Sequence, residues 1–200
     1  MTHIENIPHI LKSGITHQNS INSNKNYVSI GYPSLISKRD NFILPNGKML
    51  GNYIPFYFGP RMPMLYVIML GANSIKYDIK PVSSEDIVYC ITSVEQILAH
   101  GLRFVFSNGH AVSELTEFFD ETHIENIDNL IDKTAISAVY WVDENDLDLK
   151  RRKEAEFLVE TDIPVSALLG FAGYNDNAGK KLIELGIPEN KIAIRPAYYF

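Results

Sequence analysis

The sequence contains one cysteine in 200 residues, Cys90, which excludes a disulfide framework and a cysteine-based metal knuckle. Its six histidines are scattered, and none is spaced from another as metal ligands are. We therefore expect no metal site. A reduced, cytoplasmic protein is the default expectation for such a chain.

Long hydrophobic runs are also missing. The longest, MPMLYVIML at 62–70, is far shorter than the roughly 20 residues that a helix needs to cross a bilayer. The N-terminus lacks the charged and apolar regions of a secretory signal. We predict no membrane partner, and we interpret the run at 62–70 as a buried core strand.

Several catalytic motifs are absent. The sequence has neither the G-x-x-x-x-G-K-[ST] nor the G-x-G-x-x-G loop that cradles phosphates, and it has no G-x-S-x-G or H-E-x-x-H. Hydrolase triads and metal catalysis therefore lose most of their support.

What is present describes an ordinary globular chain: 46% hydrophobic and 21% charged residues are enough for a sizeable core, so we expect one domain over 1–200. The net charge of −6 argues against generic nucleic-acid binding. It is uneven, however. Residues 1–66 hold six Lys/Arg and two acids (+4), and residues 67–200 hold the other twelve Lys/Arg and twenty-two acids (−10). This is a hint of an anionic ligand at the first third, although solvated surface charge explains it nearly as well.

The hydrophobic pattern predicts a mixture of strands and helices. Besides the run at 62–70, we expect strands at 52–58, 86–92, 102–109, 155–160, 167–174 and 191–196, and helices at 34–40, 93–101, 110–121, 124–133 and 176–186. Because no regular βαβ rhythm connects them, the prediction is an α+β fold with mixed or antiparallel sheets flanked by helices. Residues 14–27 form a long polar loop, which is typical of a functional or mobile segment.

The hexapeptide THIENI occurs twice, at 2–7 and at 122–127. T-x-x-E is a capping-box signature, in which the threonine hydroxyl caps a helix and the glutamate reaches back to it. Thr2 with Glu5, and Thr122 with Glu125, would then each start a helix. Spacing alone favours this interpretation for both copies.

Three polar side chains stand where chemistry could occur: His3 in the first hexapeptide, Arg39 before an Asn-Gly turn, and Glu156 at the start of an apolar strand. Each has an ordinary alternative. His3 could be a helix N-terminal residue and Arg39 a surface base. Glu156 could be an edge-strand acid paired with Arg151 or Arg152.

Six blocks of sequence, taken in order, carry a resemblance to a known family. They are THIEN; NYVSIG with SLIS and Arg39; PNGK with YIPFYFGPRMPMLY; FVF with GHA; RRKEAEFLV; and the terminal PAYYF. They resemble the DarT family of NAD-dependent DNA ADP-ribosyltransferases, the toxins of DarT–DarG toxin–antitoxin systems. The resemblance runs from Thr2 to Phe200.

The resemblance implies an ADP-ribosyltransferase-like fold and NAD+ as co-substrate. It also implies single-stranded DNA as the acceptor, with thymidine favoured over guanosine, and a DarG-like macrodomain antitoxin as partner. The same chemistry on RNA or protein is the nearest alternative, and a non-catalytic NAD- or DNA-binding module is the alternative from another class.

By this resemblance, Glu156 is the essential glutamate, whose carboxylate would stabilise the positive charge that develops on the ribose. Arg39 would position NAD+. Because a guanidinium is effectively always protonated, its natural role is electrostatic rather than that of a base. His3 would hold the NAD ribose, and Thr2 and Ile4 would contact the nicotinamide amide through their backbones. The first hexapeptide is then functional and the second a helix start.

Further candidates follow from the same resemblance. In the polar loop, His17, Asn19 and Ser20 would line the NAD pocket, although such a loop could merely be solvated. Tyr57 could stack on nicotinamide, whereas Phe58 is better explained by core packing. The expected DNA contacts are Tyr140, Trp141 and Arg152, with base stacking on the two aromatic rings; a buried structural role suits the tryptophan equally.

Overall fold

The computed structural model describes residues 1–71 and 80–200 and contains two four-stranded sheets. The first has the order β1 (Thr2–His3), β3 (Ile87–Ile91), β7 (Gly170–Gly173), β8 (Ile192–Ile194); its β7–β8 pair is parallel and the others are antiparallel. The second, β2 (Ile54–Tyr57), β6 (Glu156–Val159), β4 (Phe104–Ser107), β5 (Phe118–Asp120), is antiparallel throughout. This confirms the predicted α+β class with mixed and antiparallel sheets.

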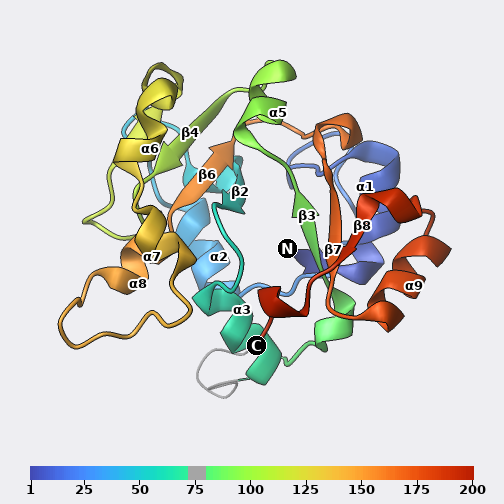
Figure 1. The fold of residues 1–200 in the computed structure, drawn as a ribbon. Coiled ribbons are helices and arrows are strands. Elements are labelled where there is room, and N and C mark those ends of the chain that lie inside the picture. The colour runs from blue at the N-terminus through green and yellow to red at the C-terminus, as the bar shows by residue number, and fades with distance from the viewer. Residues whose placement is uncertain (72–79) are drawn as a thin grey trace.

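Helices cover the outer sides of the two sheets (Figure 1). Beside the first sheet lie α1 (Ile7–Ser13) and α9 (Asp176–Glu184), and beside the second lie α6 (Ile127–Leu130), α7 (Lys133–Ser137) and α8 (Leu149–Lys153). Among the described residues, the other helices are α2 (Pro33–Asp40), α3 (Pro63–Leu70) and α5 (Val94–Ala99). Short 3-10 turns complete the fold, at Ile4–Asn6, Leu50–Asn52, Ser84–Asp86, Glu121–Asn126, Val165–Ala167, Glu189–Lys191 and Pro196–Tyr198.

The alternation of side chains along β6 separates two hydrophobic clusters. Phe157 and Val159 belong to the main core, which also takes in Phe106 and α1. Leu158 points to the other face, into a smaller cluster with Leu50. Because successive strand residues face opposite ways, Glu156 shares the face of Leu158. The glutamate is therefore placed on the side of the sheet away from the main core.

The run at 62–70 is helix α3, so the predicted core strand is wrong. Pro63 occupies the first helical turn, where its missing N–H costs nothing, and Gly71 ends the helix in the left-handed conformation (φ 57°). Leu65 and Ile68, three residues apart, are fully buried. An apolar run of this length does not reveal its period, and the Pro and Gly at its ends were the available signal.

The helix predicted at 110–121 is also wrong. Backbone hydrogen bonds from Ser113 to His110 and from Thr116 to Ser113 form successive turns there. The chain then enters β5, where Phe119 pairs with Phe106 of β4. Tertiary pairing with a buried strand has overridden the helical pattern.

Neither THIENI copy uses its threonine as a helix cap, so the predicted capping box is wrong for both copies. Thr2 lies in β1, and its hydroxyl accepts a hydrogen bond from Asn6. The caps of the two 3-10 turns are instead His3, whose Nδ1 accepts from the Glu5 amide, and Asp120, which accepts from the Thr122 amide. Each turn leads into an α-helix, as expected.

The C-terminal segment ties the first sheet together, and this predicts a measurable loss of stability. The Tyr199 ring is buried, and its hydroxyl donates toward the carbonyls of Ile87 in β3 (2.8 Å) and Ala172 in β7 (3.2 Å). Tyr199→Phe leaves these carbonyls short of a donor, so it should lower the free energy of unfolding by about 1–3 kcal/mol in urea denaturation. Tyr140→Phe, on an exposed ring, should change it by less than about 0.5 kcal/mol.

Candidate functional site

The centre of the site is the buried carboxylate of Glu156, the first residue of β6. Arg39, in the last turn of α2, donates from Nη1 to both carboxylate oxygens, at 2.7 and 3.1 Å. The backbone N–H of Ala111 donates to Oε1 at 3.1 Å, and Nδ1 of His110 lies 3.5 Å from the same oxygen. The alternative pairing of Glu156 with Arg151 or Arg152 is therefore wrong.

These contacts decide the charge of Glu156. Burial on its own raises the pKa of this carboxyl, but the Arg39 guanidinium, the His110 ring and the Ala111 amide together hold the pKa below its usual range. The side chain is thus kept as an anion inside the protein. Arg39 Nη2 is buried and has no hydrogen-bond partner, so the guanidinium retains a donor for a further acceptor.

The turn after β4 brings His110 and Ala111 to the carboxylate. The Ser107 hydroxyl donates to the Gly109 carbonyl (2.8 Å) and accepts from the Glu156 amide (3.1 Å), which joins the end of β4 to the start of β6. Arg151 in α8 braces the same turn, because its carbonyl accepts from the His110 amide at 2.9 Å.

The tight fit of this turn predicts that Gly109→Ala impairs the site. A Cβ on Gly109 would lie 2.3 Å from Arg151 Nη1 and 3.0 Å from the Arg151 carbonyl oxygen, so the backbone must shift. We expect a loss of stability of about 1–3 kcal/mol, the cost typical of overpacking. We also expect loss of whatever activity depends on His110 and Glu156. Thermal unfolding and an activity assay of the variant would check both; wild-type values for both would contradict this account.

Tyr57 lies directly opposite Glu156 in the β2–β6 pair, so the two side chains share a face. Burial and the neighbouring carboxylate of Glu156 both raise the pKa of the Tyr57 hydroxyl, which is therefore neutral. Of the residues predicted for the site, the structure thus brings together Arg39, Tyr57 and Glu156. Phe58 packs edge-on against Phe157, at 6.0 Å between ring centroids, as its predicted core role requires.

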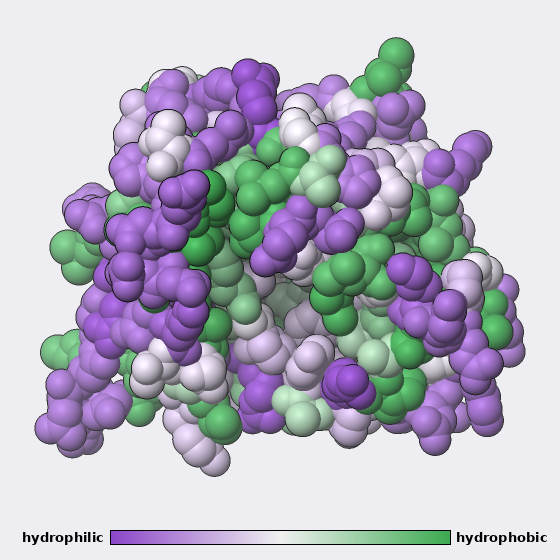
Figure 2. Space-filling model, turned by 45° about the horizontal axis from the view of Figure 1, so that its top comes forward, coloured by the Kyte–Doolittle hydropathy of each residue, from purple (hydrophilic) through white to green (hydrophobic). Residues whose placement is uncertain are grey.

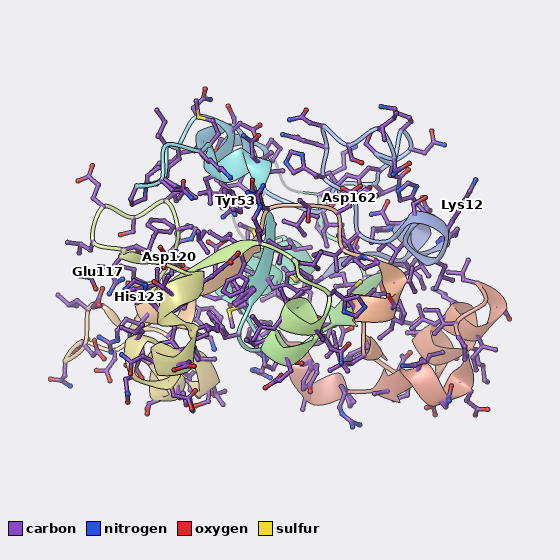
Figure 3. The ribbon with its side chains drawn as sticks, turned by 90° about the horizontal axis from the view of Figure 1, so that it is seen from above. Lys12, Tyr53, Glu117, Asp120, His123 and Asp162 are labelled. Atoms are coloured by element: carbon purple, nitrogen blue, oxygen red, sulfur yellow. The ribbon has the colours of Figure 1, made fainter. Side chains whose placement is uncertain are left out.

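The polar loop is held by a residue that the sequence did not single out. Asp162 accepts from the His17 amide (2.8 Å) and from the Ser20 hydroxyl (2.5 Å). The His17 ring accepts from the Asn19 amide at Nδ1 and donates from Nε2 to the Gly51 carbonyl at 2.5 Å. The loop is therefore fixed against the 3-10 turn that follows α2. Figure 3 shows Asp162 from above, apart from the Asp120–His123 pair.

The first hexapeptide lies in the other sheet. Thr2 pairs with Val88 and His3 with Ile87 across β1 and β3, while Ile4 is buried in the main core. In the second hexapeptide His123 contacts Asp120 at 2.9 Å, and both side chains are more than half exposed. The two copies thus share a 3-10 conformation but have different surroundings.

The three candidate DNA contacts are in three different environments. Tyr140 is 81% exposed. Trp141 is half-buried and packs edge-on against Tyr66 and Phe200, at 5.6 and 5.4 Å between ring centroids. Its ring therefore has a structural packing role, and DNA contact by it stays a prediction. Arg152 is paired with three carboxylates, Asp132, Asp146 and Asp148.

An apolar cavity of about 320 Å³ is lined by both Tyr57, opposite Glu156, and Phe157, whose side chain points away from Glu156. Its lining comes mainly from β2, β3 and α5 and includes six aromatic residues: Phe56, Tyr57, Phe58, Tyr89, Phe157 and Tyr198. Figure 2 shows a hollow with largely hydrophobic walls near the middle of one face of the molecule.

Within residues 1–71 and 80–200, no group of three or more His, Cys, Asp or Glu side chains could hold a metal ion. Over the same two ranges, no helix has the length and apolar character needed to cross a membrane.

The fold places the protein among the ADP-ribosyltransferases that modify DNA. The structure matches that of Thermus sp. 2.9 DarT in complex with ADP-ribosylated single-stranded DNA, with a TM-score of 0.84, 30% identity and coverage of 100% of this chain and 93% of that one. The structure of the same Thermus protein in complex with NAD+ gives a TM-score of 0.79.

Sequence comparison identifies the family. The DarT family, described as ssDNA thymidine ADP-ribosyltransferase, matches residues 1–200, and the chain belongs to it. It is 32% identical to the DNA ADP-ribosyl transferase of Thermus sp. strain 2.9, over all of this chain and 94% of that protein. It is 31% identical to the DNA ADP-ribosyl transferase of Escherichia coli O127:H6, over all of this chain and 91% of that protein. The protein is therefore an NAD-dependent DNA ADP-ribosyltransferase of the glycosyltransferase class.

Proposed function

We propose that this chain transfers the ADP-ribosyl group of NAD+ to thymidine in single-stranded DNA, at the site formed by Arg39 and Glu156. One observation carries the proposal: the buried carboxylate of Glu156 is paired at 2.7 Å with a guanidinium that still has a free donor. The transfer creates positive charge on the ribose as the nicotinamide bond breaks. A preorganised carboxylate stabilises such charge best where water is excluded.

The residues present fit NAD+. The unpartnered Nη2 of Arg39 suits a phosphate oxygen, and the carboxylate of Glu156 suits a ribose hydroxyl. We assign the nicotinamide side of the site to Tyr57 and to the β1 segment, through the backbones of Thr2 and Ile4 and the side chain of His3. Loop residues His17 and Asn19 complete the assignment. Bound NAD+ supplies the ribose carbon that is transferred.

Single-stranded DNA suits the site because the ring nitrogen of a base is out of reach within a duplex. The +4 charge of residues 1–66 supports contact with the phosphate backbone, and DNA affinity should then fall as salt is raised. The exposed Tyr140 is the best placed of the proposed stacking residues. Trp141 and Arg152 would contribute by shaping the 138–152 segment, and direct DNA contact by either remains a prediction.

We propose a macrodomain antitoxin as the partner of this toxin. A DNA ADP-ribosyl transferase–DNA ADP-ribosyl glycohydrolase fusion protein of Thermosipho africanus, 30% identical over 80% of this chain, joins the two activities in one polypeptide. A cytoplasmic location, where NAD+ and DNA meet, and a single domain over 1–200 belong to the same proposal.

The test is intact-mass analysis of short single-stranded oligonucleotides, with and without thymine, after incubation with the protein and NAD+. A gain of one ADP-ribose only on thymine-containing strands is expected. A gain on strands that have guanine but no thymine would overturn the choice of base. Consumption of NAD+ with label on RNA or protein and none on DNA would overturn the acceptor.

A further inference from the structure

His110 is a titratable side chain that the proposed function has not yet used. Its Nδ1 lies 3.5 Å from Glu156 Oε1 and is buried without a hydrogen-bond partner of normal geometry. The side chain as a whole keeps 21% exposure. One ring nitrogen thus faces the buried carboxylate, and another part of the ring is open to an approaching molecule.

The reaction at thymine needs a group that accepts a proton. The N3 atom of thymine carries a hydrogen that must leave as N3 bonds to the ribose. Arg39 is always protonated and donates twice to Glu156, so it cannot take the proton. Glu156 is already held as an acceptor by Arg39 and by the Ala111 amide. A neutral imidazole is the side chain best suited to accept a proton near neutral pH.

Resting on the proposed function, we propose that His110 is the general base that removes the N3 proton of the acceptor thymine, through Nε2. The bond between N3 and the ribose C1 forms as the bond from that carbon to the nicotinamide nitrogen breaks. Nicotinamide leaves as a neutral molecule, and the N3 proton passes to the imidazole. The imidazolium then directs its Nδ1–H toward the Glu156 carboxylate, which stabilises it as a carboxylate does in a catalytic triad.

The charged groups around His110 favour this role. Glu156 faces the ring from β6, and Glu154, buried in the turn before β6, also attracts its positive charge. Arg39 reaches the same carboxylate from α2. Arg151 contributes its carbonyl, which fixes the His110 backbone. The ring is therefore held in place between acids that stabilise it once it is protonated.

The experiment separates proton removal from cleavage of NAD+. Wild type, His110→Gln and His110→Ala are compared in three assays: single-turnover transfer to a thymine-containing oligonucleotide, nicotinamide release without DNA, and NAD+ affinity by calorimetry. The matched control is His123→Gln, in the second hexapeptide, where the ring is about half exposed and contacts Asp120.

We expect both His110 variants to lose about 100-fold or more in transfer at neutral pH, the usual contribution of a general base. NAD+ affinity should stay near the wild-type value, and nicotinamide release without DNA should fall far less than transfer, because neither requires the N3 proton to be removed. The difference in transfer rate between each His110 variant and wild type should become smaller as the pH is raised, because hydroxide then removes the N3 proton. His123→Gln should match wild type throughout.

Two results would overturn the proposal. Transfer and nicotinamide release that fall equally would show that His110 only positions Glu156. Transfer that stays at the wild-type rate would show that His110 has no part in the reaction. A wild-type protein that modifies no oligonucleotide would defeat the proposed function itself, and this is read from the wild-type assay alone.

Discussion

Glu156→Gln is expected to lower the rate of ADP-ribosyl transfer at least about 100-fold while leaving NAD+ and DNA affinity nearly unchanged. Glutamine keeps the shape of the side chain and can still accept from the Ala111 amide and from Arg39. It has no negative charge with which to stabilise the ribose as the nicotinamide bond breaks. Single-turnover transfer, measured beside binding titrations, checks this prediction.

Glu160→Gln is the matched control. Glu160 follows β6 by one residue and pairs with Lys48 and Arg103, away from Arg39. The Glu160→Gln variant should transfer ADP-ribose at close to the wild-type rate. Loss of binding in Glu156→Gln equal to its loss of rate would contradict a role specific to the transition state and would instead support a binding module.

Glu156→Gln should also change the stability of the protein in acid. Because the pKa of Glu156 is lowered in the folded protein, its contribution to stability is fully present above the unfolded value, roughly 4.3, and is lost as the pH falls through the folded value. Wild type should therefore lose its stability advantage over Glu156→Gln below about pH 4. Urea denaturation at neutral and at acidic pH measures the difference. An advantage that stays constant with pH would be inconsistent with a lowered pKa.

Replacing Arg39 should have the second large effect. Arg39→Met leaves the buried carboxylate of Glu156 without its cation, and breaking such a pair costs about 3–5 kcal/mol. The pKa of Glu156 should then rise, so the stability deficit shrinks as the pH falls and the carboxyl takes up a proton. Transfer should fall at least about 100-fold, because a protonated Glu156 no longer stabilises positive charge.

Arg39→Lys separates charge from geometry, since lysine keeps the charge but cannot reproduce the planar fork of donors. It should recover most of the stability and little of the transfer rate. Arg103→Met, which removes a largely exposed partner of Glu160, should cost less than about 1 kcal/mol. If Arg39→Met were as stable as wild type at neutral pH, the buried ion pair would not be the state in solution.

What the sequence encodes about the fold is clearest where the predicted helices and strands were wrong. Strands such as β3, β4 and β6 were predicted because apolar, β-branched and aromatic residues run together between turn signals. Helix α3 has the same apolar composition, and only its flanking Pro63 and Gly71 distinguish it. The β5 segment has a helical spacing of apolar residues, but it forms a strand because it pairs with β4. Local spacing in the sequence does not encode that pairing.

The site divides in the same way. The sequence and its resemblance pointed to Arg39 and Glu156, because each stands in a distinctive block. That they touch, across 117 positions of the chain, is a fact of tertiary structure. His110 stood in the GHA block without a role, and Asp162 had no local signal at all. Their partners, Glu156 and His17, are brought to them by the turn after β4 and by the loop after β6.

By itself, the sequence determined the α+β class and the absence of a disulfide framework, and its resemblance to the DarT family pointed to Arg39 and Glu156. These follow from composition, from period and from motifs, all of which are local. The tertiary structure decided which of two identical hexapeptides lies in a sheet, which arginine pairs with the glutamate, and that the carboxylate stays ionised while buried. Contacts of this kind depend on distances between segments remote in the chain, and only packing sets those distances.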